Sequence, residues 1–323
     1  MQIPVESRAP AKQARAEDRV VALPDGRVLG YGDYGDPGGL PVLGFHGTPG
    51  SRLMFQLADG PARELGIRLL APERPGFGIS SYHRGRTLAS YADDIAAFAD
   101  RLGIGAFAIA GISGGGPYAA ACAALLPDRV TALGLVSPVG PMAGAEKPDA
   151  LGRGHYFTFR VSPRVPPLLP GVFTIGRYAF LFAPATMYGF LMGRAAPSDW
   201  RILARGEVRR NLLQGVAEGM RPGVKAGLQE MRLFSRPWNI PLAAIRAPAI
   251  LWQGACDRNV PVSAALKLGA LIPGCEVHRM EKAGHYWIFD NIPAVLQRLA
   301  AASRASPAPP SRETGRERAE SLD

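Results

Sequence analysis

The chain has 323 residues, of which 47% are hydrophobic and 20% charged, a composition that excludes a fibrous or mostly disordered protein. Its three cysteines include no Cys-x-x-Cys pair, which excludes a disulfide framework and a cysteine-based zinc site. The formal net charge is +10, but the basic residues form no stripe with interleaved aromatics and match no nucleic-acid reader motif, so we expect no nucleic-acid partner.

The two ends of the chain differ from the rest. Residues 1–18 mix charged and small residues without an apolar stretch, which predicts a flexible arm and not a signal peptide. Residues 303–323 are rich in Ser, Pro, Arg and Glu, which predicts a disordered tail. An odd number of cysteines, with no signal peptide, favours a cytoplasmic location.

Between these ends, apolar strands alternate with helices. Two short strands flank the turn 24–26, Pro-Asp-Gly, and predict a hairpin at 19–23 and 27–34. The other predicted strands are 40–45, 67–71, 106–110, 129–137, 247–254 and 276–280, and the predicted helices are 88–102, 114–126, 263–271 and 292–301. Continuous apolar strands separated by helices predict an α/β protein with a mostly parallel sheet covered on both faces.

Residues 138–245 interrupt this alternation with aromatic, proline-rich and helical sequence, which predicts an inserted helical cap. The core domain would then comprise residues 19–137 and 246–302. The apolar run 171–192 is long enough to cross a bilayer, but it contains Arg177 and Pro184. Because it also connects strands of what we expect to be one sheet, we predict no transmembrane segment.

The cap carries most of the excess charge. Residues 151–245 include thirteen basic and four acidic residues, a net charge of +9, and aromatic residues crowd the first half. The aromatics fit either the cap's own core or the lining of a lipophilic pocket. For the arginines three explanations stay open: a solvated surface, recognition of an anionic group on the substrate, or peripheral contact with an anionic membrane surface.

The pentapeptide 111–115 reads Gly-Ile-Ser-Gly-Gly and fits the Gly-x-Ser-x-Gly motif, between a predicted strand and a predicted helix. Such a turn is so tight that the neighbours of the serine must lack bulk, and it lifts the hydroxyl above the sheet. The pattern predicts Ser113 as a nucleophile; the alternative is a glycine-rich helix start that only packs closely.

A serine nucleophile needs a base, and the base needs an acid that fixes its tautomer. His285 follows the last predicted strand and is the expected base. Asp257 follows the strand 247–254 and is the expected acid, with a turn-forming aspartate as the alternative. Of the other histidines we expect His278 to be structural, and His83 and His155 to lie on the surface.

Residues 44–50 read Gly-Phe-His-Gly-Thr-Pro-Gly and follow the first long apolar strand. Glycines let a backbone approach a substrate closely, so the amides of Thr48 and Gly114 are the expected donors of an oxyanion hole. We expect His46 and Gly47 to support this loop. No metal and no cofactor are implied.

These motifs, together with Glu-Arg-Pro-Gly-Phe-Gly-Ile-Ser at 73–80, make residues 19–302 resemble a serine hydrolase of the α/β-hydrolase fold family with an inserted cap domain. Most relatives have Asp where this chain has Glu73. The His-Gly-x-Pro motif is also similar to that of epoxide hydrolases and haloalkane dehalogenases, but their nucleophile is an aspartate, where this chain has Ser113. Proline iminopeptidases resemble the chain too, but its acid-poor cap argues against binding an amino terminus.

The resemblance implies a carboxylesterase-like serine hydrolase that cleaves a small, largely apolar ester through an acyl-enzyme on Ser113. Two alternatives stay open. The same residues would serve a C–C bond hydrolase or a lactonase, and this fold also carries receptors for small molecules. A scaffold without activity would normally have lost Ser113 or His285.

Overall fold

A computed structural model describes residues 18–149, 151–165 and 168–306, and most of the predicted arm and tail, residues 1–17 and 307–323, lies outside them. Its strands are β1 (Arg19–Ala22), β2 (Val28–Gly35), β3 (Leu40–Phe45), β4 (Ile67–Pro72), β5 (Phe107–Ile112), β6 (Val130–Val136), β7 (Ala249–Gly254) and β8 (Glu276–Met280). They form one sheet in the order β1-β2-β4-β3-β5-β6-β7-β8, in which only β1–β2 and β2–β4 pair antiparallel. The predicted mostly parallel sheet is confirmed.

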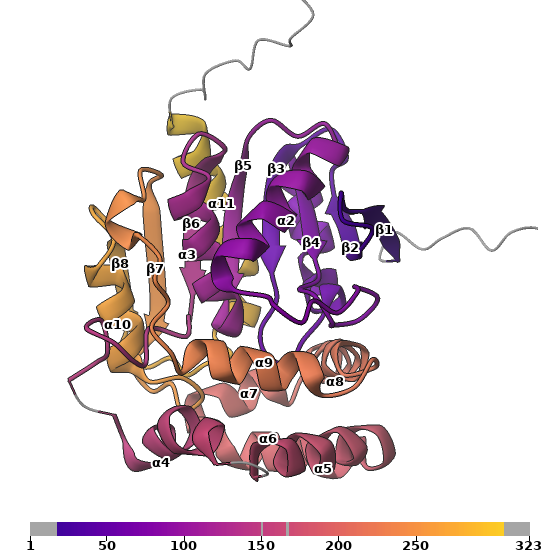
Figure 1. The fold of residues 1–323 in the computed structure, drawn as a ribbon, viewed down its shortest axis with the longest axis vertical. Helices are drawn as coiled ribbons and strands as arrows, with labels where there is room; N and C mark the ends of the chain where they lie inside the picture. The colour runs from indigo at the N-terminus through magenta and orange to yellow at the C-terminus, as the bar shows by residue number, and fades with distance from the viewer. Residues whose placement is uncertain (1–17, 150, 166–167, 307–323) are drawn as a thin grey trace, which may run out of the picture.

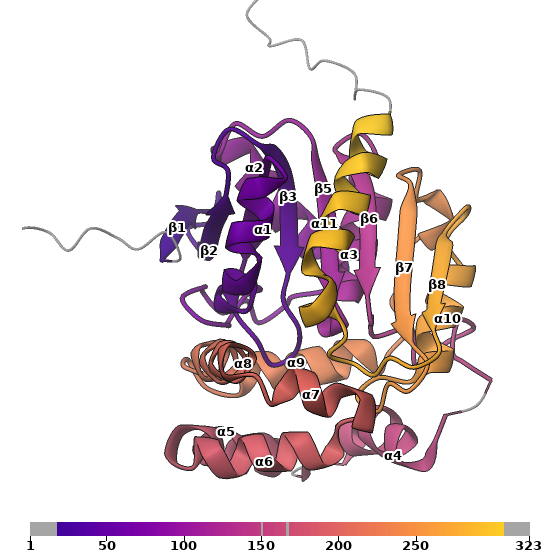
Figure 2. The ribbon, with the colours of Figure 1, turned by 180° about the vertical axis from the view of Figure 1, so that it is seen from behind.

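Helices cover both faces of the sheet (Figures 1 and 2). One face carries α2 (Leu88–Arg101), α3 (Gly116–Leu125) and α10 (Val262–Ala270), whose buried residues share one apolar cluster. The other carries α1 (Asp59–Glu64) and α11 (Ile288–Ala305). All residues of α3 from Gly116 to Ala124 are buried, and most are alanine, so this helix lies close against the central strands.

The described residues of the stretch 138–245 lie across the carboxyl ends of the parallel strands (Figure 1). Its helices are α4 (Arg153–Tyr156), α5 (Leu168–Phe182), α6 (Pro184–Arg194), α7 (Trp200–Leu203), α8 (Gly206–Gly219) and α9 (Lys225–Phe234), with short turns η3 (Phe157–Val161), η4 (Ser162–Arg164), η5 (Pro197–Asp199) and η6 (Leu242–Ala244). Both views show α8 and α9 next to the strand ends, and α5 and α6 in a layer farther from the sheet (Figures 1 and 2).

The structure differs from the expectations in three places. The helical segment η1 (Arg52–Ala58), which continues into α1 between β3 and β4, was not predicted. Helix α11 continues to Ala305, into the predicted tail, because Ser303 is buried and its hydroxyl lies 2.6 Å from that of Thr131. Asp18, the last residue of the predicted arm, forms an ion pair with the buried Arg52.

Candidate active site

Ser113 lies in the tight turn η2 (Ser113–Gly115) between β5 and α3. Its φ is +52°, in the left-handed region that costs a non-glycine residue free energy and is usually found at functional turns. Two glycines of the motif are required because a larger residue would collide with neighbouring atoms. A Cβ on Gly111 would lie 2.6 Å from the Cβ of Ala119, and one on Gly115 would lie 2.2 Å from the carbonyl oxygen of Phe45. The turn therefore holds the Ser113 hydroxyl at the carboxyl end of the sheet.

The structure brings His285 and Asp257 together, since His285 Nδ1 lies 2.7 Å from Asp257 Oδ2. The other oxygen of Asp257 accepts the amides of Asn259 and Val260 at 2.8 and 3.0 Å. Burial raises the pKa of Asp257, but the His285 ring and the two amides lower it by more, so it lies below its usual range. Burial lowers the pKa of His285, but Asp257 raises it by more, so it lies above its usual value.

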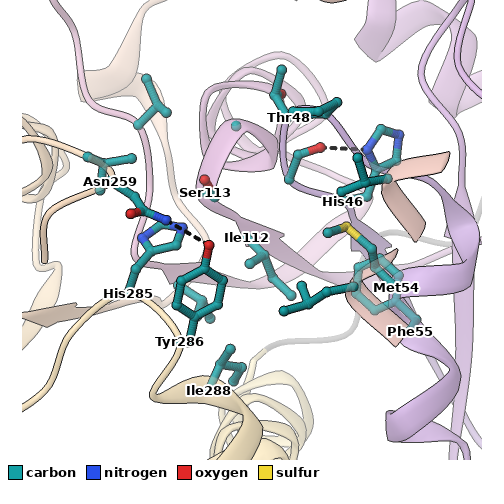
Figure 3. A pocket seen from close by; sticks show the side chains of 18 of the residues that line it. His46, Thr48, Met54, Phe55, Ile112, Ser113, Asn259, His285, Tyr286 and Ile288 are labelled. Atoms are coloured by element: carbon teal, nitrogen blue, oxygen red, sulfur yellow. Dashed lines mark hydrogen bonds between the residues drawn. The ribbon is translucent and has the colours of Figure 1, made fainter. Parts of the chain in front are cut away.

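The loop after β3 packs against the Ser113 turn. A Cβ on Gly114 would lie only 3.2 Å from the Thr48 nitrogen, which shows how close the two backbones are. His46 supports this loop: it is fully buried, and its Nε2 accepts the Arg74 amide at 3.3 Å. Burial and the Arg74 cation hold the pKa of His46 well below its usual value. The ring is therefore neutral, and Nδ1 donates its proton to the Gly47 carbonyl at 2.8 Å (Figure 3).

Two residues that sequence analysis did not single out hold the same loop. Arg74 is fully buried and donates to the carbonyl oxygens of His46 and Gly47 at 2.5 and 3.0 Å. Its Nε donates to Glu230, a fully buried residue of α9, and the other oxygen of Glu230 accepts the Thr48 hydroxyl at 2.5 Å. A carboxylate from the cap region therefore fixes the backbone that carries the Thr48 amide. The only feature of the sequence that could have drawn attention to Glu230 is that it is one of just four acidic residues between 151 and 245.

A second carboxylate of the same region, Asp199, holds the loop that carries His285. Its Oδ2 accepts the His285 amide at 2.8 Å, and its side chain is buried. A Cβ on Gly284 would lie 2.1 Å from this oxygen, so the residue before His285 has no room for a side chain. Burial raises the pKa of Asp199 above its usual value.

Ser113 and His285 line one cavity of about 290 Å³. Figure 3 shows Ser113 between His285 on one side and the loop with His46 and Thr48 on the other. Apolar side chains form most of the wall. They come from the sheet, η1 and α11 on one side, such as Leu69, Phe55 and Leu296, and from residues 159–234 on the other, such as Phe159, Met231 and Phe234. The arrangement places a hydroxyl and an imidazole at the wall of an apolar cavity.

Some aromatic residues of the cap region, residues 138–245, line the cavity, and others pack within the cap region itself. The sequence had left both roles open. Phe159 and Phe180 line the cavity. Tyr188 belongs to a buried cluster between α6 and α8, and its hydroxyl donates to the Leu203 carbonyl at 2.6 Å. Phe182, by contrast, is 79% exposed.

The other three histidines, His83, His155 and His278, are not among the residues that line the cavity of Ser113. His278 is partly exposed and lies 2.7 Å from Glu276, while His155 lies 3.3 Å from the carbonyl oxygen of Arg258. No group of three or more His, Cys, Asp or Glu side chains within residues 18–149, 151–165 and 168–306 is arranged to hold a metal ion.

In the described part of the chain no single helix is long and apolar enough to cross a bilayer. One pair of helical segments, Arg153–Arg164 and Leu169–Phe182, has sufficient length and composition together but bends by 111° between the two.

Known proteins resemble this chain in sequence and in fold. The non-heme chloroperoxidase of Streptomyces lividans is 34% identical over 44% of this chain and 53% of its own length. In four of the curated relatives, this one included, the match spans only 35–53% of the relative's length. The bifunctional esterase/perhydrolase DCH of Acinetobacter calcoaceticus is 28% identical over 77% of this chain and 86% of its own.

Solved structures share the fold. An esterase from Thermogutta terrifontis superimposes with a TM-score of 0.64 and 24% identity, over 90% of this chain and 98% of that one. The model of the α/β-hydrolase fold family matches residues 41–292, which include Thr48, Ser113, Asp257 and His285. The chain therefore belongs to the α/β-hydrolase fold family.

Proposed function

We propose that this protein is a serine hydrolase that cleaves a small, largely apolar ester through an acyl-enzyme on Ser113. The observation that carries the proposal is the placement of Ser113 and the His285–Asp257 pair at one apolar cavity of about 290 Å³. A curated relative named as an esterase/perhydrolase, matched over 77% of this chain, supports ester chemistry.

In the first half of the reaction, Ser113 Oγ attacks the ester carbonyl carbon while its proton passes to His285 Nε2. Asp257 accepts the hydrogen bond from Nδ1 and so fixes the tautomer that leaves Nε2 free. The amides of Thr48 and Gly114 donate to the developing oxyanion. The bond from the carbonyl carbon to the alcohol oxygen then breaks, and the alcohol leaves with the proton from His285.

In the second half, a water molecule gives a proton to His285 and attacks the acyl carbon, the bond to Ser113 breaks, and the serine recovers its proton. The apolar wall holds the acyl group because each Å² removed from water contributes about 25 cal/mol. Among the described residues no hydrogen bond joins Ser113 to His285, and such bonds commonly tighten only when the substrate is bound.

Labelling with a fluorophosphonate tests the nucleophile. Ser113→Ala should abolish labelling and lower kcat by several orders of magnitude. Ser137→Ala is a matched control because Ser137 likewise follows a parallel strand, β6, and has a positive φ of +42°, and this variant should still be labelled. Full ester turnover by Ser113→Ala protein would overturn the proposal.

A panel of p-nitrophenyl esters, lactones and substrates with a scissile C–C bond tests the reaction type. Turnover of esters with release of the acid supports an ester hydrolase, and exclusive turnover of lactones or of C–C substrates would replace it with the corresponding hydrolase. A receptor built on this fold would release product only in near-stoichiometric amount. Multiple turnovers per molecule therefore exclude the receptor.

A further inference from the structure

A second, wider hollow of about 570 Å³ lies beside the cavity of Ser113. It is bounded by α4 and η3, by α6, and by the loop that follows β7. Phe180, Leu191, Asn259 and Tyr286 line both the hollow and the cavity, so the two spaces adjoin. We call this hollow the vestibule. A substrate too long for the cavity would extend into it.

The vestibule carries three exposed arginines, Arg153, Arg194 and Arg258. None of them takes part in an ion pair among the described residues, although Arg201, Arg205 and Arg221 of residues 138–245 do. Arg194 lies over the ring of Phe190, 5.7 Å from its centroid, which restrains the guanidinium on the vestibule wall. Three cations from three different segments therefore face one space.

No carboxylate neutralises these cations. Of the described residues that line the vestibule, only Asp257 is acidic, and it is hydrogen-bonded to His285 and to two backbone amides. The sequence between residues 151 and 198 contains no Asp or Glu. The planar, weakly hydrated guanidinium suits carboxylate and phosphate groups in particular.

We infer that the vestibule binds an anionic group, a carboxylate or a phosphate, on the part of the substrate that stays outside the apolar cavity. This inference rests on the proposed function, because it assigns the two ends of the substrate to the two adjoining spaces. The apolar end reaches Ser113, and the anionic end meets Arg153, Arg194 and Arg258.

Matched esters test the inference. Each pair shares one apolar acyl group, and the alcohol ends in a carboxylate, a phosphate or a neutral carboxamide of similar size. Single exposed ion pairs contribute little, so only the three arginines together should give a measurable preference. We expect kcat/KM for an anionic ester to exceed that of the carboxamide by about tenfold at low salt, equivalent to about 1.4 kcal/mol.

Two triple variants distinguish local binding in the vestibule from long-range electrostatic attraction by a basic protein. Arg153→Gln, Arg194→Gln and Arg258→Gln together should reduce the preference to near one, mainly through KM. The matched control removes the same charge from exposed arginines outside the vestibule, by Arg210→Gln, Arg232→Gln and Arg236→Gln, and should keep the preference.

Equal losses in the two triple variants would show long-range steering and overturn the site. If the wild-type protein cleaves the carboxamide ester but prefers neither anionic ester, the inference fails and the proposed function stands. If it cleaves no ester and Ser113 is not labelled, the proposed function itself has failed.

A second inference rests on a different observation, the exposed side of α5. Four apolar side chains of this helix are more than half exposed, with Phe182 at 79% and Ile175 at 71%; the full set, which we call the apolar face, is Val172, Ile175, Tyr178 and Phe182. The four recur at helical spacing along one side. Figures 1 and 2 show α5 in the layer farthest from the sheet, and these four side chains stay exposed among the described residues.

The net positive charge of the segment that carries the apolar face indicates its partner. The acid-free stretch 151–198 carries five arginines, so a second copy of the chain would bring like charges together. An anionic lipid surface offers apolar depth and opposite charge at once. We propose that the apolar face docks on an anionic bilayer, with Phe182 and Ile175 among the lipid headgroups.

Vesicle sedimentation tests this docking. The protein should sediment with vesicles of phosphatidylcholine and phosphatidylglycerol, and much less with phosphatidylcholine alone. Ile175→Ser with Phe182→Ser should lower binding at least tenfold, since each large apolar side chain removed from water contributes roughly that factor. Val20→Ser with Val277→Ser is the matched control, because these exposed valines lie on β1 and β8, and it should bind like wild type.

Unchanged binding by the Ile175→Ser and Phe182→Ser variant would overturn the docking. Size-exclusion chromatography without lipid tests whether a second copy of the chain binds the apolar face instead. A dimer that this variant dissociates would assign the apolar face to a second copy and likewise overturn the proposal.

Discussion

Replacement of Glu230 by Gln would remove the negative partner of a fully buried cation. Glu230 and Arg74 both have side chains that are 0% exposed, and Arg86, equally buried, approaches the same carboxylate at 3.6 Å. Removal of one partner leaves an uncompensated buried charge, which costs about 3–5 kcal/mol. We expect the free energy of unfolding to fall by about that amount in Glu230→Gln.

The same change should slow the reaction. The Thr48 hydroxyl donates to Glu230 at 2.5 Å, and Arg74 connects Glu230 to the carbonyls of His46 and Gly47. A neutral amide holds this loop less firmly, so the Thr48 amide would be displaced. Loss of a whole oxyanion donor lowers kcat by about 10²–10³, which sets the upper limit for the effect. KM should change less, because Glu230 does not line the cavity.

The assay combines urea unfolding with ester turnover measured well below the melting temperature. Asp290→Asn is the control: Asp290 pairs with Arg201 and Arg205 at 3.3 and 3.1 Å on the surface, where such pairs contribute about 1 kcal/mol or less. A Glu230→Gln protein as stable and as active as Asp290→Asn would refute the conclusion that this carboxylate holds the loop.

Three further outcomes are expected. Asp257→Asn should lower kcat by roughly 10⁴, and, because Asp257 raises the pKa of His285, the acid limb of a kcat/KM profile should move to lower pH in this variant. Gly115→Ala should yield little folded protein by circular dichroism, because its Cβ would lie 2.2 Å from the Phe45 carbonyl oxygen. Asp199→Ala should lower the free energy of unfolding by about 1–3 kcal/mol in a denaturant titration because it leaves the His285 amide without its acceptor, and Asp199→Asn, which keeps an acceptor oxygen, should lose less.

Local sequence patterns predicted the sheet well because its inner strands β3 to β7 are almost wholly buried and therefore continuously apolar, unlike the mostly exposed edge strands β1 and β8. The bounds of β3 and β8 match the predicted runs, and the strand–turn–helix context of Ser113 follows from glycines that contact neighbouring backbone. The segment η1–α1 was missed because its short helical turns are interrupted by Gly60 and Pro61, which hide the helical periodicity.

The contacts that hold the loops of Thr48 and His285 could not be predicted in the same way. Glu230 and Arg74 are 156 positions apart, and their pairing depends on how α9 packs across the strand ends. In the sequence Glu230 looks like Glu207 or Glu218, yet Glu207 is half exposed and pairs with its neighbour Arg205. These acids differ in how deeply they are buried, and burial can be known only from the packed structure.

Glu230 and Asp199, which extend from the cap region into the core domain, limit how the inserted segment of such a protein can change during evolution. A lid that only covers a substrate can be exchanged for another without loss of the chemistry beneath it. Here Glu230 secures the Thr48 loop and Asp199 secures the His285 loop, so a transplanted segment would have to bring acids to both places. A substitution at Arg74 would need a compensating substitution at Glu230. A new substrate range would therefore arise more easily by substitution of the residues in the apolar wall than by exchange of the whole inserted segment.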